Sequence, residues 1–142
     1  WADEGDVYAG GANSTILHWD GAGWIQESHP LSGPARMNDI WGVSDGCSQT
    51  TQGFYITVAP DFKLLRRTNA GWIEEPAPSS TSSWSYGYIG VWGQNPDGLY
   101  LLNEDGNSGP APFGTVQRRV DTTWSRTGVW QVPGKFVAIR GD

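Results

Sequence analysis

The sequence contains a single cysteine, Cys47, among its 142 residues. One cysteine excludes a disulfide bond within the chain. Histidine is almost as scarce, and only His18 and His29 are present. No catalytic triad of serine, histidine and an acidic residue follows from their spacing, because triads are defined by geometry in space. This shortage of catalytic groups predicts a protein that is not an enzyme.

Positive charge is also scarce. Nine lysine and arginine residues stand against fifteen aspartate and glutamate residues, which gives a formal net charge of −6. A nucleic-acid interface needs a basic surface to neutralise phosphates. The chain has no basic stripe, so we expect no nucleic-acid partner. The pairs Arg66-Arg67 and Arg118-Arg119 fall in predicted strands, where neighbouring side chains point to opposite faces of a sheet.

Long apolar runs and helical periodicity are both missing. No stretch approaches the roughly 18 apolar residues of a membrane span, and no window has the apolar spacing of an amphipathic helix. Twenty glycines and nine prolines indicate many turns, and nine tryptophans, five tyrosines and four phenylalanines can build a core. We therefore predict one all-β domain. The chain begins on Trp1 without a basic, apolar leader, so we expect a processed, trimmed or partial chain.

What the chain does have is a repeat of four short segments. The first is Asp39-Ile40-Trp41-Gly42-Val43, which recurs at 89–93 and more weakly at 127–131. Apolar runs with an aromatic residue follow, at 6–10, 53–58, 98–102 and 135–139. Third segments lie at 16–20, 62–67 and 115–120, and the fourth segments contain Trp24, Trp72 and Trp124. Four short strands repeated at roughly 45 residues are the signature of β-propeller blades.

The repeat predicts a β-propeller of four-stranded antiparallel blades, about three and a half of them, with the first strand of each blade innermost. The blades span about 1–28, 39–75 and 89–127, and a partial fourth blade spans 129–140. A closed propeller has about 4–8 blades, and an open stack exposes apolar faces and strand edges. We therefore expect a second chain or fragment to complete the ring. An irregular fourth blade that closes the chain on itself is the alternative.

The best copy of the repeat resembles a known class of propeller. Its residues Asp6-Val7-Tyr8-Ala9-Gly10-Gly11, 15–21 and Gly23-Trp24, followed by Asp39-Ile40-Trp41-Gly42, are similar to the Trp-rich repeats of bacterial secreted and surface β-propellers. Those repeats share their architecture with kelch, tectonin and WD40 repeats. The resemblance covers almost the whole chain and implies a binding scaffold and an extracellular or cell-surface location, but no reaction. Unlike WD40 repeats, the chain carries Trp-Asp only once, at Trp19-Asp20.

Tryptophan recurs at two positions of the repeat, which are represented by Trp41, Trp92 and Trp130 and by Trp24, Trp72 and Trp124. Such recurrence is what packing between blades demands, because each blade buries the same face on its neighbour. We therefore expect these side chains in the core. Repeated sugar-binding sites, as in lectin propellers, are the alternative.

Two segments around the third predicted blade depart from the repeat, namely the connection 76–88 and the loop 103–114, and both are expected on one face of the propeller. They carry Trp84, Tyr86, Tyr88, Asn103, Glu104, Asp105 and Asn107. Aromatic rings beside amides and carboxylates suit a sugar, which stacks its C–H face and hydrogen-bonds its hydroxyls. We predict a binding module for carbohydrate or another polar ligand. The alternative is a structural or protein-interaction segment, in which Trp84 and Tyr86 only pin a loop to the blade.

The same loop places oxygen-bearing side chains at alternate positions, Asn103, Asp105 and Asn107, as calcium-binding loops do. It lacks the glycine at the sixth position and the glutamate at the twelfth, which is Gly114 here. We therefore predict no metal and no other cofactor, with calcium at these three residues as the alternative.

Overall fold

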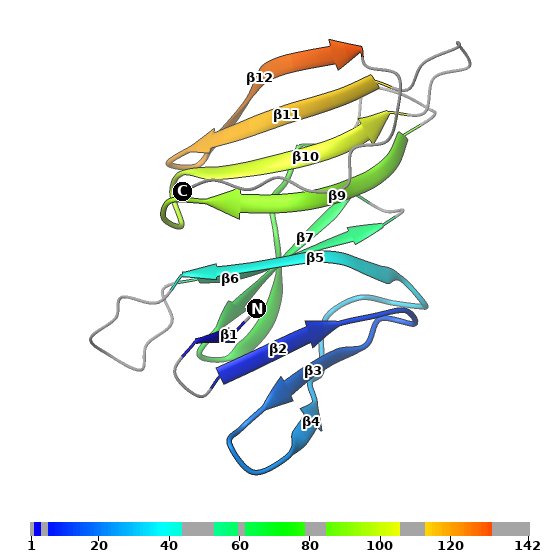
Figure 1. Cartoon of the computed structure of the whole chain (residues 1–142), viewed down its shortest axis with the longest axis vertical. Helices are drawn as coiled ribbons and strands as arrows, with labels where there is room; N and C mark the ends of the chain where they lie inside the picture. The colour runs from blue at the N-terminus through cyan, green and yellow to red at the C-terminus, as the bar shows by residue number, and fades with distance from the viewer. Residues whose placement is uncertain are drawn as a thin grey trace.

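Three four-stranded antiparallel sheets make up the described part of the chain in the computed structural model. The structure describes residues 2–3, 6–43, 53–59, 62–78, 85–105 and 113–131. The side chains it describes are those of residues 7–42, 53–59, 62–78, 87–103 and 114–127. Figure 1 shows the sheets one above another, with the N-terminal sheet at the bottom and the C-terminal sheet at the top. No helix occurs within the described residues, so the all-β prediction is confirmed for them.

Each sheet uses four strands in chain order. The first sheet consists of β1 (Ala2–Asp3), β2 (Asp6–Gly10), β3 (Ile16–Trp19) and β4 (Trp24–Gln26). The middle sheet consists of β5 (Arg36–Val43), β6 (Gly53–Ala59), β7 (Lys63–Thr68) and β8 (Gly71–Glu75). The third sheet consists of β9 (Ser85–Gly93), β10 (Leu99–Asp105), β11 (Phe113–Val120) and β12 (Thr123–Gln131).

Short polar turns hold the hairpins. Between β3 and β4, the Asp20 carboxylate accepts hydrogen bonds from the backbone N–H groups of Ala22 and Gly23, both at 2.8 Å. These donors lower the pKa of Asp20. Between β9 and β10, the Asn95 side chain accepts from the N–H of Asp97 at 3.1 Å and of Gly98 at 2.9 Å. Asx side chains commonly cap turns in this way.

The middle sheet is covered on both faces. Phe54, Ile56 and Val58 of β6 belong to a core cluster shared with the first sheet. The intervening Tyr55 and Leu64 of β7 belong to a second cluster shared with the third sheet. Because successive strand residues point to opposite faces, the two clusters explain why β6 is an almost continuous run of apolar residues.

The middle and third sheets repeat the same irregularity. In β5 the pairing with β6 skips Asn38, and in β9 the pairing with β10 skips Ile89. Three residues later, Trp41 pairs with Tyr55 and Trp92 pairs with Tyr100. The two aromatic pairs have ring centroids 6.0 and 5.6 Å apart. Equivalent bulges and equivalent pairs show that one structural unit is used twice.

Several predicted boundaries are wrong. β12 continues to Gln131 as one strand, so residues 129–131 belong to the third sheet and do not begin a fourth. β10 continues to Asp105, which pairs with Phe113 of β11, and β9 already begins at Ser85. Strand pairing extends these elements into polar sequence, since β propensity yields to the partner strand. Residues 132–142, which hold the rest of the predicted fourth blade, lie outside the described residues.

Candidate interaction surface

The first and middle sheets meet through a carboxylate on one side and two nitrogen donors on the other. Glu27, which directly follows β4, lies 3.0 Å from Nε of Arg67. The indole N–H of Trp72 donates to the same carboxylate. Trp72 is only 6% exposed, and its ring meets Tyr8 edge-on at 5.9 Å. The largely buried Glu27 carboxylate thus links the end of β4 in the first sheet to β7 and β8 of the middle sheet.

The middle and third sheets meet through the same chemistry. The Glu75 carboxylate accepts a hydrogen bond of 2.8 Å from Nη1 of Arg119, which is 7% exposed. The indole N–H of Trp124 donates to the carbonyl of Pro76 at 3.0 Å. The Arg119 guanidinium also lies 5.7 Å from the Tyr55 ring and 5.8 Å from the Trp124 ring, which is cation–π distance.

Strand registers show that these contacts are equivalent. Arg67 pairs across the strands with Trp72, and Arg119 pairs with Trp124. In the first sheet the same position is occupied by the pair Trp19 and Trp24. The first sheet therefore carries tryptophan where the other two carry arginine.

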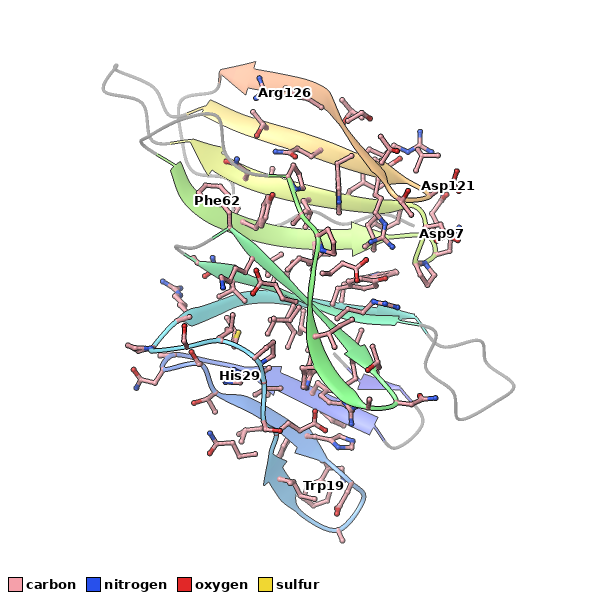
Figure 2. The ribbon with its side chains drawn as sticks, turned by 180° about the vertical axis from the view of Figure 1, so that it is seen from behind. Trp19, His29, Phe62, Asp97, Asp121 and Arg126 are labelled. Atoms are coloured by element: carbon pink, nitrogen blue, oxygen red, sulfur yellow. The ribbon has the colours of Figure 1, made fainter. Side chains whose placement is uncertain are left out.

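The first sheet packs on the middle sheet through Tyr8 and Ile16, and no described residue of another sheet covers its opposite face. We call it the outer face; it is formed by Val7, Ala9, Leu17, Trp19, Trp24 and Gln26, which share one side of β2–β4 by their pairing. Trp24 is 52% exposed, and its ring lies 5.8 Å from that of Trp19. Figure 2 shows Trp19 at the end of the molecule opposite Arg126 of the third sheet.

The residues equivalent to the outer face are buried elsewhere. Phe54 of the middle sheet and Leu99 of the third sheet occupy the position of Val7, and both are buried against the preceding sheet. Trp72 is buried where Trp24 is exposed. The expectation that each repeated tryptophan lies in the core is therefore wrong for Trp24, and the side chain of Trp130 lies outside the description.

Strands β2, β5 and β9 add further contacts between the sheets. Asp39 of β5 accepts a hydrogen bond of 3.1 Å from the N–H of Val91 in β9. Asn38 donates to the carbonyl of Tyr88 at 2.7 Å. On the other side, a Cβ added to Gly10 would stand 2.8 Å from Cβ of Met37, so glycine permits the close approach of β2 and β5. These contacts give the first repeated segment a structural role.

The predicted ligand-binding residues are only partly brought together. Tyr88 is fully buried and donates its hydroxyl to the carbonyl of Pro78, and burial raises its pKa. Asn103 is also buried. Both lie in strands, β9 and β10, and neither presents its side chain to solvent, which corrects their expected place in surface loops. Buried aromatic side chains such as Tyr88 commonly form part of a protein core.

The other predicted ligand-binding residues are described in backbone only or not at all. Tyr86 lies in β9, and Glu104 and Asp105 lie in β10, with side chains outside the described set. Trp84 and Asn107 lie outside the described residues. Asp105 pairs with both Ser85 and Phe113. The connection 76–88 and the loop 103–114 therefore meet at one end of the third sheet.

The two histidines have structural contacts. His18 stacks on Tyr8 with ring centroids 4.4 Å apart, and its Nδ1 lies 3.4 Å from the Glu27 carboxylate. His29 hydrogen-bonds the carbonyl of Ser14 through Nε2. Among the described side chains, no three His, Cys, Asp or Glu residues group as metal ligands would. None of the described segments forms a helix of the length and apolarity that crossing a membrane requires.

Sequence reasoning found the repeated tryptophans but missed the ion pairs between sheets. The signal was present, since Glu27 and Glu75 each follow a repeated tryptophan by three residues, and Arg67 and Arg119 each precede one by five.

No protein-family model, no curated protein and no solved structure matches the chain.

Proposed function

We propose that this chain is a non-catalytic, propeller-type interaction segment whose outer face packs against a β-sheet of another chain or segment. The outer face carries this proposal, because its counterparts in the other two sheets are buried against a preceding sheet. In a repeat protein every unit buries the same face on its neighbour. An exposed apolar face of this kind marks an interaction surface.

The chemistry of the outer face fits another β-sheet. Trp24 and Trp19 supply flat apolar area, and each indole N–H needs an acceptor when it is buried. Trp72 and Trp124 find those acceptors in a carboxylate and a carbonyl at the end of a neighbouring fourth strand. A sheet that presents an acceptor at the end of its outer strand therefore satisfies the outer face in the same manner.

The test places a photo-crosslinking amino acid at Trp24 and, in a matched variant, at Ile73. Ile73 is also an exposed apolar residue of an outer strand, but both faces of its sheet are already covered. In the organism that makes the protein, position 24 should crosslink to strand residues of a protein, and position 73 should not. Equal crosslinking at the two positions would contradict the proposed function.

Carbohydrate recognition is the second candidate, with an extracellular or cell-surface location. It is supported by the pairing of Asp105 with Ser85 and Phe113, which brings the ends of the two non-repeating segments together. Trp84→Ala combined with Asp105→Ala should abolish binding on a glycan array while unfolding free energy changes by no more than about 1–2 kcal/mol. An unchanged array signal, or no signal from the unmodified chain, would remove this candidate. Neither candidate uses a metal or another cofactor.

A further inference from the structure

The first and third sheets depart from the repeated contact in complementary ways. At both contacts between sheets, a carboxylate of one sheet, Glu27 or Glu75, meets an arginine of the next, Arg67 or Arg119. In the third sheet Thr127 stands at the sequence spacing of the carboxylate, three residues after Trp124, and it is the residue that the pairing of β12 with β11 skips. In the first sheet the place of the arginine is taken by Trp19.

The two replacements remove both charges of one ion pair. A carboxylate buried without its arginine, or an arginine buried without its carboxylate, is strongly unfavourable. Neither problem arises where Thr127 meets Trp19 and Trp24. The Thr127 hydroxyl is exposed and donates to the carbonyl of Val116 at 3.1 Å, so its oxygen can still accept from an indole N–H. The first and third sheets therefore bring no unpaired charge to a contact between them.

Building on the proposed function, we propose that the outer face of the first sheet binds the third sheet of a second copy of this chain, head to tail. The contact continues the two that join the sheets within the chain. In the second copy this contact uses the face of the third sheet that points away from the middle sheet. There Trp92, Tyr100 and Arg118 form an aromatic and cationic stack. Tyr100 holds the position of Tyr8 and Tyr55, and both of those are buried where two sheets meet.

Head-to-tail contacts use two different surfaces, so they close into a ring or continue as a filament. Two copies bring six described sheets together, a number within the range of about 4–8 blades that propellers use. The expected minimum assembly is therefore a dimer.

The first experiment is sedimentation of the purified chain over a range of concentrations. The monomer mass is 15.5 kDa, and we expect a concentration-dependent rise to twice that mass or more. A crosslinker at position 24 should then capture a peptide from 123–127 of a second copy. The monomer mass at every concentration would overturn this inference. Crosslinks from position 24 to a different protein would overturn self-association but leave the proposed function standing. The absence of any crosslink would overturn both self-association and the proposed function.

The second experiment restores the missing ion pair between copies. Trp19→Arg alone and Thr127→Glu alone should each weaken self-association by roughly tenfold or more, because each buries an unpaired charge. Mixed together, the two variants should associate with each other about as well as the unmodified chain does. Asn69→Arg and Asn69→Glu, in an exposed turn of the middle sheet, are matched charge controls and should change nothing.

Two outcomes of the second experiment decide against the inference. One is association that ignores both charge changes, and the other is mixed variants that associate no better than either alone. Circular dichroism checks that each variant folds. If Trp19→Arg does not, Trp24→Lys takes its place against Thr127→Glu, because Trp24 is half exposed and lies outside the core clusters.

Discussion

The ion pair between Glu75 and Arg119 gives the sharpest test of how the sheets are held together. Its partners are 2.8 Å apart, and their side chains are 15% and 8% exposed. One residue earlier in β8, Glu74 forms a pair of 2.9 Å with Lys63, but these side chains are 49% and 30% exposed. The two pairs have nearly the same length but differ in burial, and Glu75 also accepts a hydrogen bond of 2.9 Å from Nε of Arg66.

Glu75→Gln should cost about 2–4 kcal/mol of unfolding free energy, because it leaves the buried Arg119 guanidinium without its countercharge. Glu74→Gln should cost about 0–1 kcal/mol, the usual range for solvent-exposed pairs. The difference corresponds to a melting temperature lowered by roughly 10 °C in a chain of this size. Urea unfolding at one fixed protein concentration measures both values, because the contribution of self-association is then the same for each variant.

A double variant identifies the cause. Adding Arg119→Met to Glu75→Gln removes the unpaired charge and should recover part of the lost stability. The reasoning is refuted if Glu75→Gln and Glu74→Gln cost the same within about 1 kcal/mol, or if the double variant is less stable than Glu75→Gln alone.

Two further predictions concern burial. Burial raises the pKa of Tyr88, so the folded state keeps the phenol protonated above the usual tyrosine pKa of about 10; this part of the stability is complete below about pH 10 and is lost as the pH rises further. Tyr88→Phe should flatten that alkaline loss in urea unfolding at a series of pH values, and an unchanged slope would contradict it. Gly10→Ala should cost about 1–3 kcal/mol through collision with Met37, whereas Gly23→Ala, which meets nothing within 4 Å, should stay within about 0.5 kcal/mol.

Much of the fold could be predicted because its signals are local. The turns at Asp20 and Asn95 depend on side chains that bind their own backbone two and three residues ahead. The pairs Trp41 with Tyr55 and Trp92 with Tyr100 follow from the repeated segments once the strands are antiparallel. Strand ends were less predictable. β12 runs through Gly128 because β11 pairs with it along its whole length. Nothing in the segment 127–131 itself indicates that pairing.

The candidate site was predicted less well than the fold. Tyr88 looked like a loop residue because a segment rich in serine and proline precedes it, yet it lies in β9 and is packed in a core cluster. Conversely, Trp24 looked like a core residue because it matches Trp72 and Trp124 in the repeat, yet it is exposed. A pattern identifies equivalent positions but does not say which of them have a neighbour.

The sequence by itself determined the strand order, the hairpin turns and the spacing of Glu27, Arg67 and their repeats, because these depend on residues close together in the chain. Only the tertiary structure decided which of these residues are buried. Trp72 is covered because the first sheet lies in front of it, and Trp24 is open because no described residue of another sheet lies in front of the first sheet. Burial is a relation between sheets, so identical residues at equivalent positions contribute differently to stability.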